Sequence, residues 1–202
     1  KAQAAWWSAG ADHYALLEAS APFDRPATVT TVVEDGLALQ DLLVAQHPTG
    51  KLAWAVPRQA VAMLTQRDAT GEVAQRDLPW LPRALAFAAD GELYWAGYAD
   101  SQVLLASTAH PEPLALGEFT DVIALALCAA PGERAYVAVA GVAREGGAGL
   151  YVLTAAAPAV RLSGAQAEPH LACSGGGMAQ AAWLEASGLQ YASSADWSLV
   201  TT

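Results

Sequence analysis

Two cysteines are the residues of this chain with the greatest capacity for covalent chemistry. They begin the segments "CAAPG" (128–132) and "CSGGG" (173–177), so each lies four residues before a glycine. No base or positive charge adjoins Cys128 or Cys173, which disfavours a redox or catalytic pair. Two interpretations stay open: a disulfide, which requires Cα atoms within about 7 Å, and two buried free thiols that behave as small apolar residues.

The other chemically capable residues do not form a known catalytic pattern. The four histidines, His13, His47, His110 and His170, have no partner at the spacing of a zinc site. The segment "SGGGM" (174–178) lacks the Lys-Ser/Thr of a phosphate-binding loop, and we interpret it as a hairpin turn. Gly-x-Ser-x-Gly and His-Glu-x-x-His motifs are absent from the sequence. No metal or cofactor is predicted, and the sequence leaves open whether the chain is an enzyme.

Composition limits the possible partners. The 202 residues are 54% hydrophobic and 15% charged, so we expect a folded chain with one domain over 1–202. The formal charge of −10 disfavours nucleic acid and anionic membranes, which attract basic surfaces. The longest apolar run, Val122–Ala130, is much shorter than the roughly 20 residues that span a bilayer, so no membrane span is predicted.

The sequence contains an internal repeat, marked by regularly spaced glycines, and this repeat predicts where the cysteines and three aromatic residues lie. Gly50, Gly91 and Gly132 are evenly spaced, and each is followed four residues later by an aromatic residue: Trp54, Trp95 and Tyr136. Gly177 begins a further unit at slightly longer spacing. This alignment places the two cysteines at equivalent positions of successive units, and it predicts similar buried environments for the three aromatic residues.

Each repeat is predicted to contain four short β-strands. In the segment 83–108, "ADG" and "YADS" separate apolar stretches, and Asp-Gly between such stretches favours a tight hairpin. Four strands per unit indicate an all-β fold, and specifically a β-propeller of about five four-stranded blades. The abundant alanine and the segment Gly36–His47, which could form an amphipathic helix, favour instead an α/β sandwich-like fold. Other all-β folds are a further alternative.

The strand count falls one short of five complete blades. We count about nineteen strands where five four-stranded blades need twenty. "AQAAWWSAG" (2–10) matches "AQAAWLEASG" (179–188), which places the first segment at a second strand and leaves the first blade without its innermost strand. In an alternative register the last blade lacks its outermost strand. The chain is therefore expected to be completed by another protein chain, or to be a segment of a larger propeller.

The segment "AAPGERAYVAVAG" (Ala129–Gly141) resembles β-propeller repeats of the YVTN-like kind, because a Pro-Gly turn leads into a short Tyr-Val strand. The resemblance implies a binding platform, often outside the cytoplasm, and in some cases the large subunit of a redox enzyme. The chain departs from other propellers: it has no Trp-Asp dipeptide of the WD kind and no asparagine, which lactonase-type propellers use as a metal ligand.

Candidate ligand-binding residues follow from the predicted blades. One face of the propeller would gather the turns between second and third strands and the links between blades, around the central channel. The residues predicted to bind a ligand there are Trp80, Arg83, Asp121 and His170, with Arg58, Asp100, Glu118 and Arg144 on the same face.

The predicted function is that of a non-catalytic binding or scaffold propeller, which lies outside the cytoplasm (periplasmic or secreted) and acts through another protein chain. The alternative is a subunit of a carbohydrate-active or redox enzyme with its site at the central channel. Paired carboxylates about 5 to 9.5 Å apart would favour glycoside chemistry.

Overall fold

The structure is a computed structural model. It describes residues 2–9, 14–21, 28–35, 43–58, 61–132, 134–195, 197 and 199–201, with side chains described only between 43 and 197. These residues form eighteen β-strands and no helix, so the prediction of an all-β fold is confirmed. Of the segment Gly36–His47, residues 36–42 lie outside the described part, and Leu43–Gln46 form a strand. The chain divides into two compact units, Lys1–Pro79 and Trp80–Thr202.

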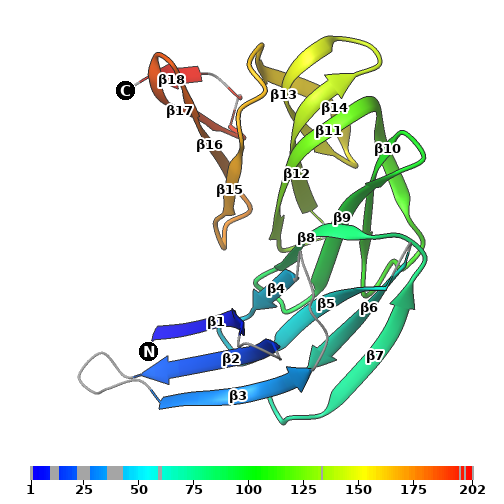
Figure 1. Ribbon diagram of the computed structural model, residues 1–202. Coiled ribbons are helices and arrows are strands. Elements are labelled where there is room, and N and C mark those ends of the chain that lie inside the picture. Colours follow the sequence, from blue (N-terminus) through cyan, green and yellow to red (C-terminus); the bar gives the residue numbers. More distant parts are fainter. Residues whose placement is uncertain are drawn as a thin grey trace. The chain divides into compact units, whose positions relative to one another are not determined.

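The first unit contains two antiparallel sheets, named here the first and second sheets (Figure 1). The first has the order β1-β2-β3 and the second the order β4-β5-β6-β7, so each strand pairs with its neighbour in the chain. Strand β1 also contacts β4 of the second sheet. The bounds are β1 Ala2–Ala9, β2 Tyr14–Ala21, β3 Thr28–Asp35, β4 Leu43–Gln46, β5 Leu52–Arg58, β6 Val61–Arg67 and β7 Val73–Leu78.

The second unit contains a seven-stranded sheet and a four-stranded sheet, again with strands in chain order (Figure 1). The seven-stranded sheet runs from β8 to β14, and the four-stranded sheet from β15 to β18. The bounds are β8 Pro82–Phe87, β9 Leu93–Ala99, β10 Gln102–Ser107, β11 Leu114–Ala130, β12 Arg134–Ala143, β13 Gly147–Thr154, β14 Ala157–Ser163, β15 His170–Cys173, β16 Ala179–Glu185, β17 Gly188–Ser193 and β18 Leu199–Thr201.

Strand β11 divides the seven-stranded sheet into two four-stranded halves. Its first part, up to Glu118, pairs with β10, and its second part, from Phe119 to Ala130, pairs with β12. We name β8–β11 the third sheet, β11–β14 the fourth and β15–β18 the fifth. Each is an antiparallel meander, and the first meander has three described strands where the others have four.

The fourth sheet is buried on both faces. On β12, Val137 and Val139 join one apolar cluster with residues of the third sheet, while Ala138 and Ala140 join another with residues of the fifth. Alternate residues of a strand point to opposite faces, so β12 must be apolar throughout, and its alanines allow the fifth sheet to approach closely. The third, fourth and fifth sheets therefore stack face to face in chain order.

Three turns between first and second strands share one hydrogen-bonded geometry. The amides of Gly50, Gly91 and Gly177 each donate to the carbonyl oxygen three residues earlier, at 2.9 Å in all three turns. The three glycines have φ values of 94°, 86° and 88°, a region that favours glycine because it has no Cβ. The recurring glycines found in the sequence are therefore recurring turn positions.

The strand register corrects the repeat alignment in the fourth sheet. Cys128 pairs with Tyr136 as Ala86 pairs with Tyr94, so Tyr136 is equivalent to Tyr94 and not to Trp95. The directions of the two side chains support this equivalence. Tyr94 of the third sheet packs against the fourth sheet, and Tyr136 of the fourth sheet packs against the fifth. Val137 takes the place of Trp95. Accordingly Trp54 and Trp95 are buried, at 4% and 1% exposure, whereas Tyr136 is only partly buried.

Candidate functional site

Trp80, the first predicted site residue, is held in the core beneath strand β9. Its side chain is 5% exposed, and a Cβ added at Gly97 would lie 2.7 Å from the indole. The same Cβ would lie 2.5 Å from the carbonyl oxygen of Leu81. Gly97 is therefore required so that the segment before β8 can approach the sheet. The buried indole presents little surface to a ligand.

Arg83 is positioned by a β-bulge at the start of β8. Pro82 pairs with Gly97 and Ala84 with Ala96, so Arg83 is the extra residue between them. Its Nη1 atom donates a hydrogen bond to the carbonyl oxygen of Val122, at 2.8 Å. This bond ties β8 to the start of the second part of β11.

Tyr98 completes the surroundings of Arg83. The Arg83 guanidinium lies 5.8 Å from the centre of the Tyr98 ring, within the range of a cation–π contact. The Tyr98 hydroxyl in turn donates to the carbonyl oxygen of Phe119, at 2.9 Å. Both side chains thus hydrogen-bond to the backbone of β11, and sequence reasoning had not singled out Tyr98.

The other two predicted site residues are exposed. Asp121 precedes Val122 on β11 and so lies beside the Arg83 contact, and its carbonyl oxygen lies against Gly141. His170 begins β15 opposite Ala182. Within the described part of the chain, no hydrogen bond or ion pair joins His170 to the other three predicted residues. The side chain of Arg58 lies outside the described residues.

A cleft of about 670 Å³ lies between the third and fourth sheets, close to Glu118 and Arg144. Its base contains Phe119 and Tyr151, which meet edge to face with ring centres 5.6 Å apart. Arg144 donates to Glu118 across its rim at 2.5 Å, and this hydrogen bond raises the pKa of the Arg144 guanidinium. The lining residues are Gly117, Glu118, Phe119, Ala143, Arg144, Glu145, Tyr151, Leu153 and Ala159.

The cleft combines an apolar base with a charged rim. Phe119 and Tyr151 are 2% and 4% exposed, so they support the cleft and offer little ring surface. The Tyr151 hydroxyl donates to the carbonyl oxygen of Gly147 at 2.8 Å. Among the described residues, no group of three or more His, Cys, Asp or Glu side chains could hold a metal ion. The cleft therefore exposes mainly the charged side chains of its rim, Arg144 and Glu118, which are 71% and 49% exposed.

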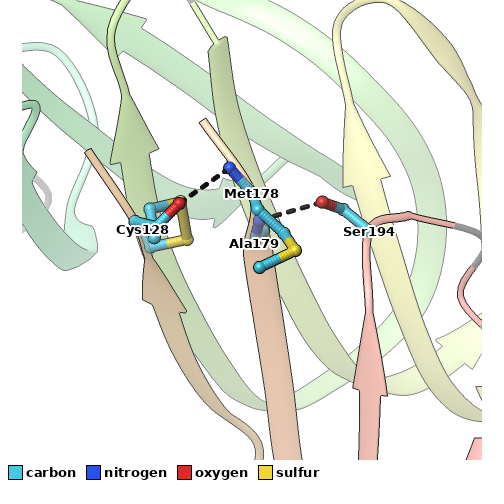
Figure 2. Close-up of a disulfide and its surroundings, with 6 residues drawn as sticks. Cys128, Met178, Ala179 and Ser194 are labelled. Atoms are coloured by element: carbon cyan, nitrogen blue, oxygen red, sulfur yellow. Dashed lines mark hydrogen bonds between the residues drawn. A yellow bond between two sulfur atoms is a disulfide. The ribbon is translucent and has the colours of Figure 1, made fainter. Parts of the chain in front are cut away.

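Cys128 and Cys173 form a disulfide in the structure, with their Cα atoms 5.5 Å apart (Figure 2). The bond joins the first strand of the fourth sheet to the first strand of the fifth. Beside it, the amide of Met178 donates to Ser174 Oγ at 3.1 Å, and the amide of Ala179 donates to Ser194 Oγ at 2.9 Å (Figure 2). These bonds satisfy the backbone of the glycine-rich turn, which agrees with its interpretation as a hairpin.

Two carboxylates form hydrogen-bond networks that sequence reasoning missed. Glu92 accepts bonds from Ser107 Oγ at 2.5 Å and from the Tyr94 hydroxyl at 3.1 Å. Glu185 accepts bonds from Ser163 Oγ and from Trp183 Nε1, the latter at 2.8 Å. Both hydrogen bonds lower the pKa of Glu185, and the bond from Ser163 makes the larger contribution to this shift. The Glu185 network links the fourth sheet to the fifth.

Comparison with known proteins assigns no family to the chain. No protein-family model matches it, and a search of curated proteins finds no match. None of the described residues forms a helix with the length and apolarity needed to cross a membrane.

Proposed function

We propose that the five sheets are the blades of a β-propeller. Three features support this architecture. Every sheet is an antiparallel meander in chain order. The third, fourth and fifth sheets pack face to face through apolar clusters. Their first strands also lie next to one another, because β8 contacts β11 and β11 contacts β15. Radial stacking of four-stranded sheets with adjacent first strands is typical of propellers.

The function we propose is non-catalytic binding or scaffolding through another protein chain. It is carried by one observation, the position of β1. In the fourth sheet the second strand, β12, contacts β15, the first strand of the sheet that follows. Strand β1 likewise contacts β4, and its residues 2–6 repeat the "AQAAW" of β16, the second strand of the fifth sheet, so we assign β1 to a second-strand position. No described strand pairs with its other edge, and such an edge is a template for a strand from another polypeptide.

The proposed location outside the cytoplasm is supported by the Cys128–Cys173 disulfide. Disulfides form and persist in oxidising compartments and are rare in the cytosol. The acidic charge of −10 is compatible with a protein partner and unfavourable for nucleic acid.

Native mass spectrometry of the protein purified from its natural source tests this function. We expect the polypeptide that contains this sequence to be recovered together with a second, stoichiometric polypeptide. Recovery of this chain alone, folded and monomeric, would refute the proposal. The architecture is tested separately by an experimental structure, in which five sheets around one axis are expected.

A further inference from the structure

A small pocket lies between the third and fourth sheets and shares no lining residue with the cleft beside Glu118 and Arg144. Its volume is about 220 Å³. It is lined by residues of β9, β10 and β11, by the segment that links β10 to β11, and by Ala155 in the turn between β13 and β14. An apolar cavity of about 150 Å³ can hold one benzene molecule. The pocket therefore has room for a single ring that carries a short substituent.

The larger part of the pocket surface is apolar. Tyr94 and Leu105 belong to the apolar cluster between the third and fourth sheets and form the buried wall of the pocket. Leu114 pairs with Leu105 on the neighbouring strand, yet it is 47% exposed. The fourth sheet contributes only the small side chain of Ala155. A hydrocarbon group in the pocket would contact these apolar side chains and cover part of Leu114, which favours its binding.

The polar groups of the lining are available mainly as hydrogen-bond acceptors. The hydroxyls of Ser107 and Tyr94 both donate to the carboxylate of Glu92, at 2.5 and 3.1 Å. The amide of His110 in turn donates to Ser107 Oγ at 3.0 Å. These three hydrogens are therefore already engaged within the protein, whereas the hydroxyl oxygens keep lone pairs. A molecule bound here is thus expected to donate hydrogen bonds.

The charge of the pocket favours the same kind of ligand. Glu112 lines it with an exposed carboxylate, and Glu92 lies behind the two hydroxyls. None of the described residues that line the pocket is lysine or arginine. An anionic ligand would meet carboxylates without a balancing cation, whereas a protonated nitrogen would form charge-assisted hydrogen bonds. Charge complementarity therefore favours a cation.

We propose that this pocket binds a small free amine, in which a protonated nitrogen is carried by one ring or by a branched hydrocarbon of similar size. The hydrocarbon part packs against Tyr94, Leu105 and Leu114, and the nitrogen donates to the carboxylate of Glu112. This site goes beyond the proposed function, because it lies wholly within the second unit and requires neither a protein partner nor a strand at the edge of β1.

Titration with benzylamine tests the proposal, because this probe joins one ring to an amine that is protonated at neutral pH. Benzyl alcohol, which has the same ring and no charge, is the matched control ligand. Binding is followed through the amide signals of the full chain, with its disulfide intact, in two-dimensional NMR spectra. We expect benzylamine to bind about tenfold more tightly than benzyl alcohol, since a hydrogen bond to a charged group contributes more than a neutral one. The largest shifts should fall on the residues that line the pocket.

Three variants at exposed positions separate the roles of charge and apolar contact. Glu112→Gln should remove most of the preference for benzylamine and leave the affinity for benzyl alcohol unchanged. Glu145→Gln is the matched control, because it removes one exposed carboxylate from the other cleft and should keep the preference. Leu114→Ala should weaken the binding of both ligands about fivefold, because each loses apolar contact.

Several results would overturn the proposal. Equal affinities for the two ligands would show that the pocket does not select an amine. The same loss of preference in Glu145→Gln as in Glu112→Gln would show that only the net charge of the protein attracts the probe. The largest shifts outside the pocket, or no shifts at millimolar concentrations, would show that the pocket is not the binding site. Equally tight binding of N-acetyl-lysine methylamide would assign the pocket to a lysine side chain of another protein, and a free amine would be the wrong ligand.

Discussion

Cys128 and Cys173 differ by one position in the structural repeat, and this difference turns their side chains toward each other. Cys128 pairs with Tyr136, on the face of the fourth sheet that packs against the fifth. Cys173 pairs with Ala179, which shares its face with Trp183, directed at the fourth sheet. At strictly equivalent positions both cysteine side chains would point to the same face of their own sheets, and they would not face each other. The prediction that the cysteines are equivalent is therefore corrected by one residue.

Removing the disulfide should lower stability. It closes a separation of 45 residues in sequence, and constraint of the unfolded chain by such a loop contributes about 2 to 4 kcal/mol. We expect this loss for the double variant Cys128→Ser, Cys173→Ser in urea unfolding. A reducing agent should destabilise the wild type by a similar amount and leave the double variant unchanged. An effect of the reductant on both proteins would contradict this account.

Trp95 is expected to be one of the largest single contributors to the core. It is 1% exposed and belongs to the largest fully buried side chains. Trp95→Ala should cost about 3 to 5 kcal/mol, because the transfer free energy is lost and a cavity remains. Leu184, which is 70% exposed, is the control, and Leu184→Ala should change stability by less than about 0.5 kcal/mol. Similar losses for both variants in chemical denaturation would mean that the described core is wrong.

Gly97 should not tolerate even a methyl group. A Cβ there would lie 2.5 Å from the Leu81 carbonyl oxygen, which is backbone and cannot rotate away. Gly97→Ala is therefore expected to cost about 1 to 3 kcal/mol through overpacking. Gly175→Ala is the matched control, since a Cβ at Gly175 meets nothing within 4 Å. Thermal unfolding of the two variants measures the difference, and an unaffected Gly97→Ala protein would disprove the close approach of this segment.

Local turn chemistry made part of the fold predictable. The recurring glycines occupy turn positions with positive φ, and the apolar stretches between them form strands. The all-β class could therefore be predicted from the sequence. The placement of Tyr136 did not follow. After Arg134, the segment "AYVAVAG" is apolar because β12 is buried on both faces. It therefore lacks the alternation of polar and apolar residues that would show which side chains share a face.

The candidate site was less predictable than the strands, for two physical reasons. The direction of Arg83 depends on a bulge, an extra residue that is visible only in the pairing of β8 with β9. The hydrogen bond from Arg83 to the Val122 carbonyl joins distant parts of the sequence, and backbone acceptors carry no sequence signature. Glu118 and Arg144 were predicted to lie on one face of the propeller, but their direct ion pair follows from the packing of β11 and β12 and has no sequence signature.

Glu185 should make stability depend on pH in the acidic range. Its pKa is lowered from the ordinary value of 4.5, first by the hydrogen bond from Ser163 and then by that from Trp183. A carboxylate with a lowered folded-state pKa stabilises the protein above its unfolded-state pKa, and this contribution is lost as the pH falls through the folded-state pKa. Glu185→Gln removes the charge at every pH.

The urea midpoint of the wild type should therefore exceed that of Glu185→Gln most at neutral pH, and the difference should shrink as the pH falls below 4.5. Glu112→Gln, at an exposed position, controls for the loss of one negative charge. A difference between wild type and Glu185→Gln that stays constant from pH 7 to pH 3 would show that the Glu185 carboxylate does not stabilise the contact between the fourth and fifth sheets.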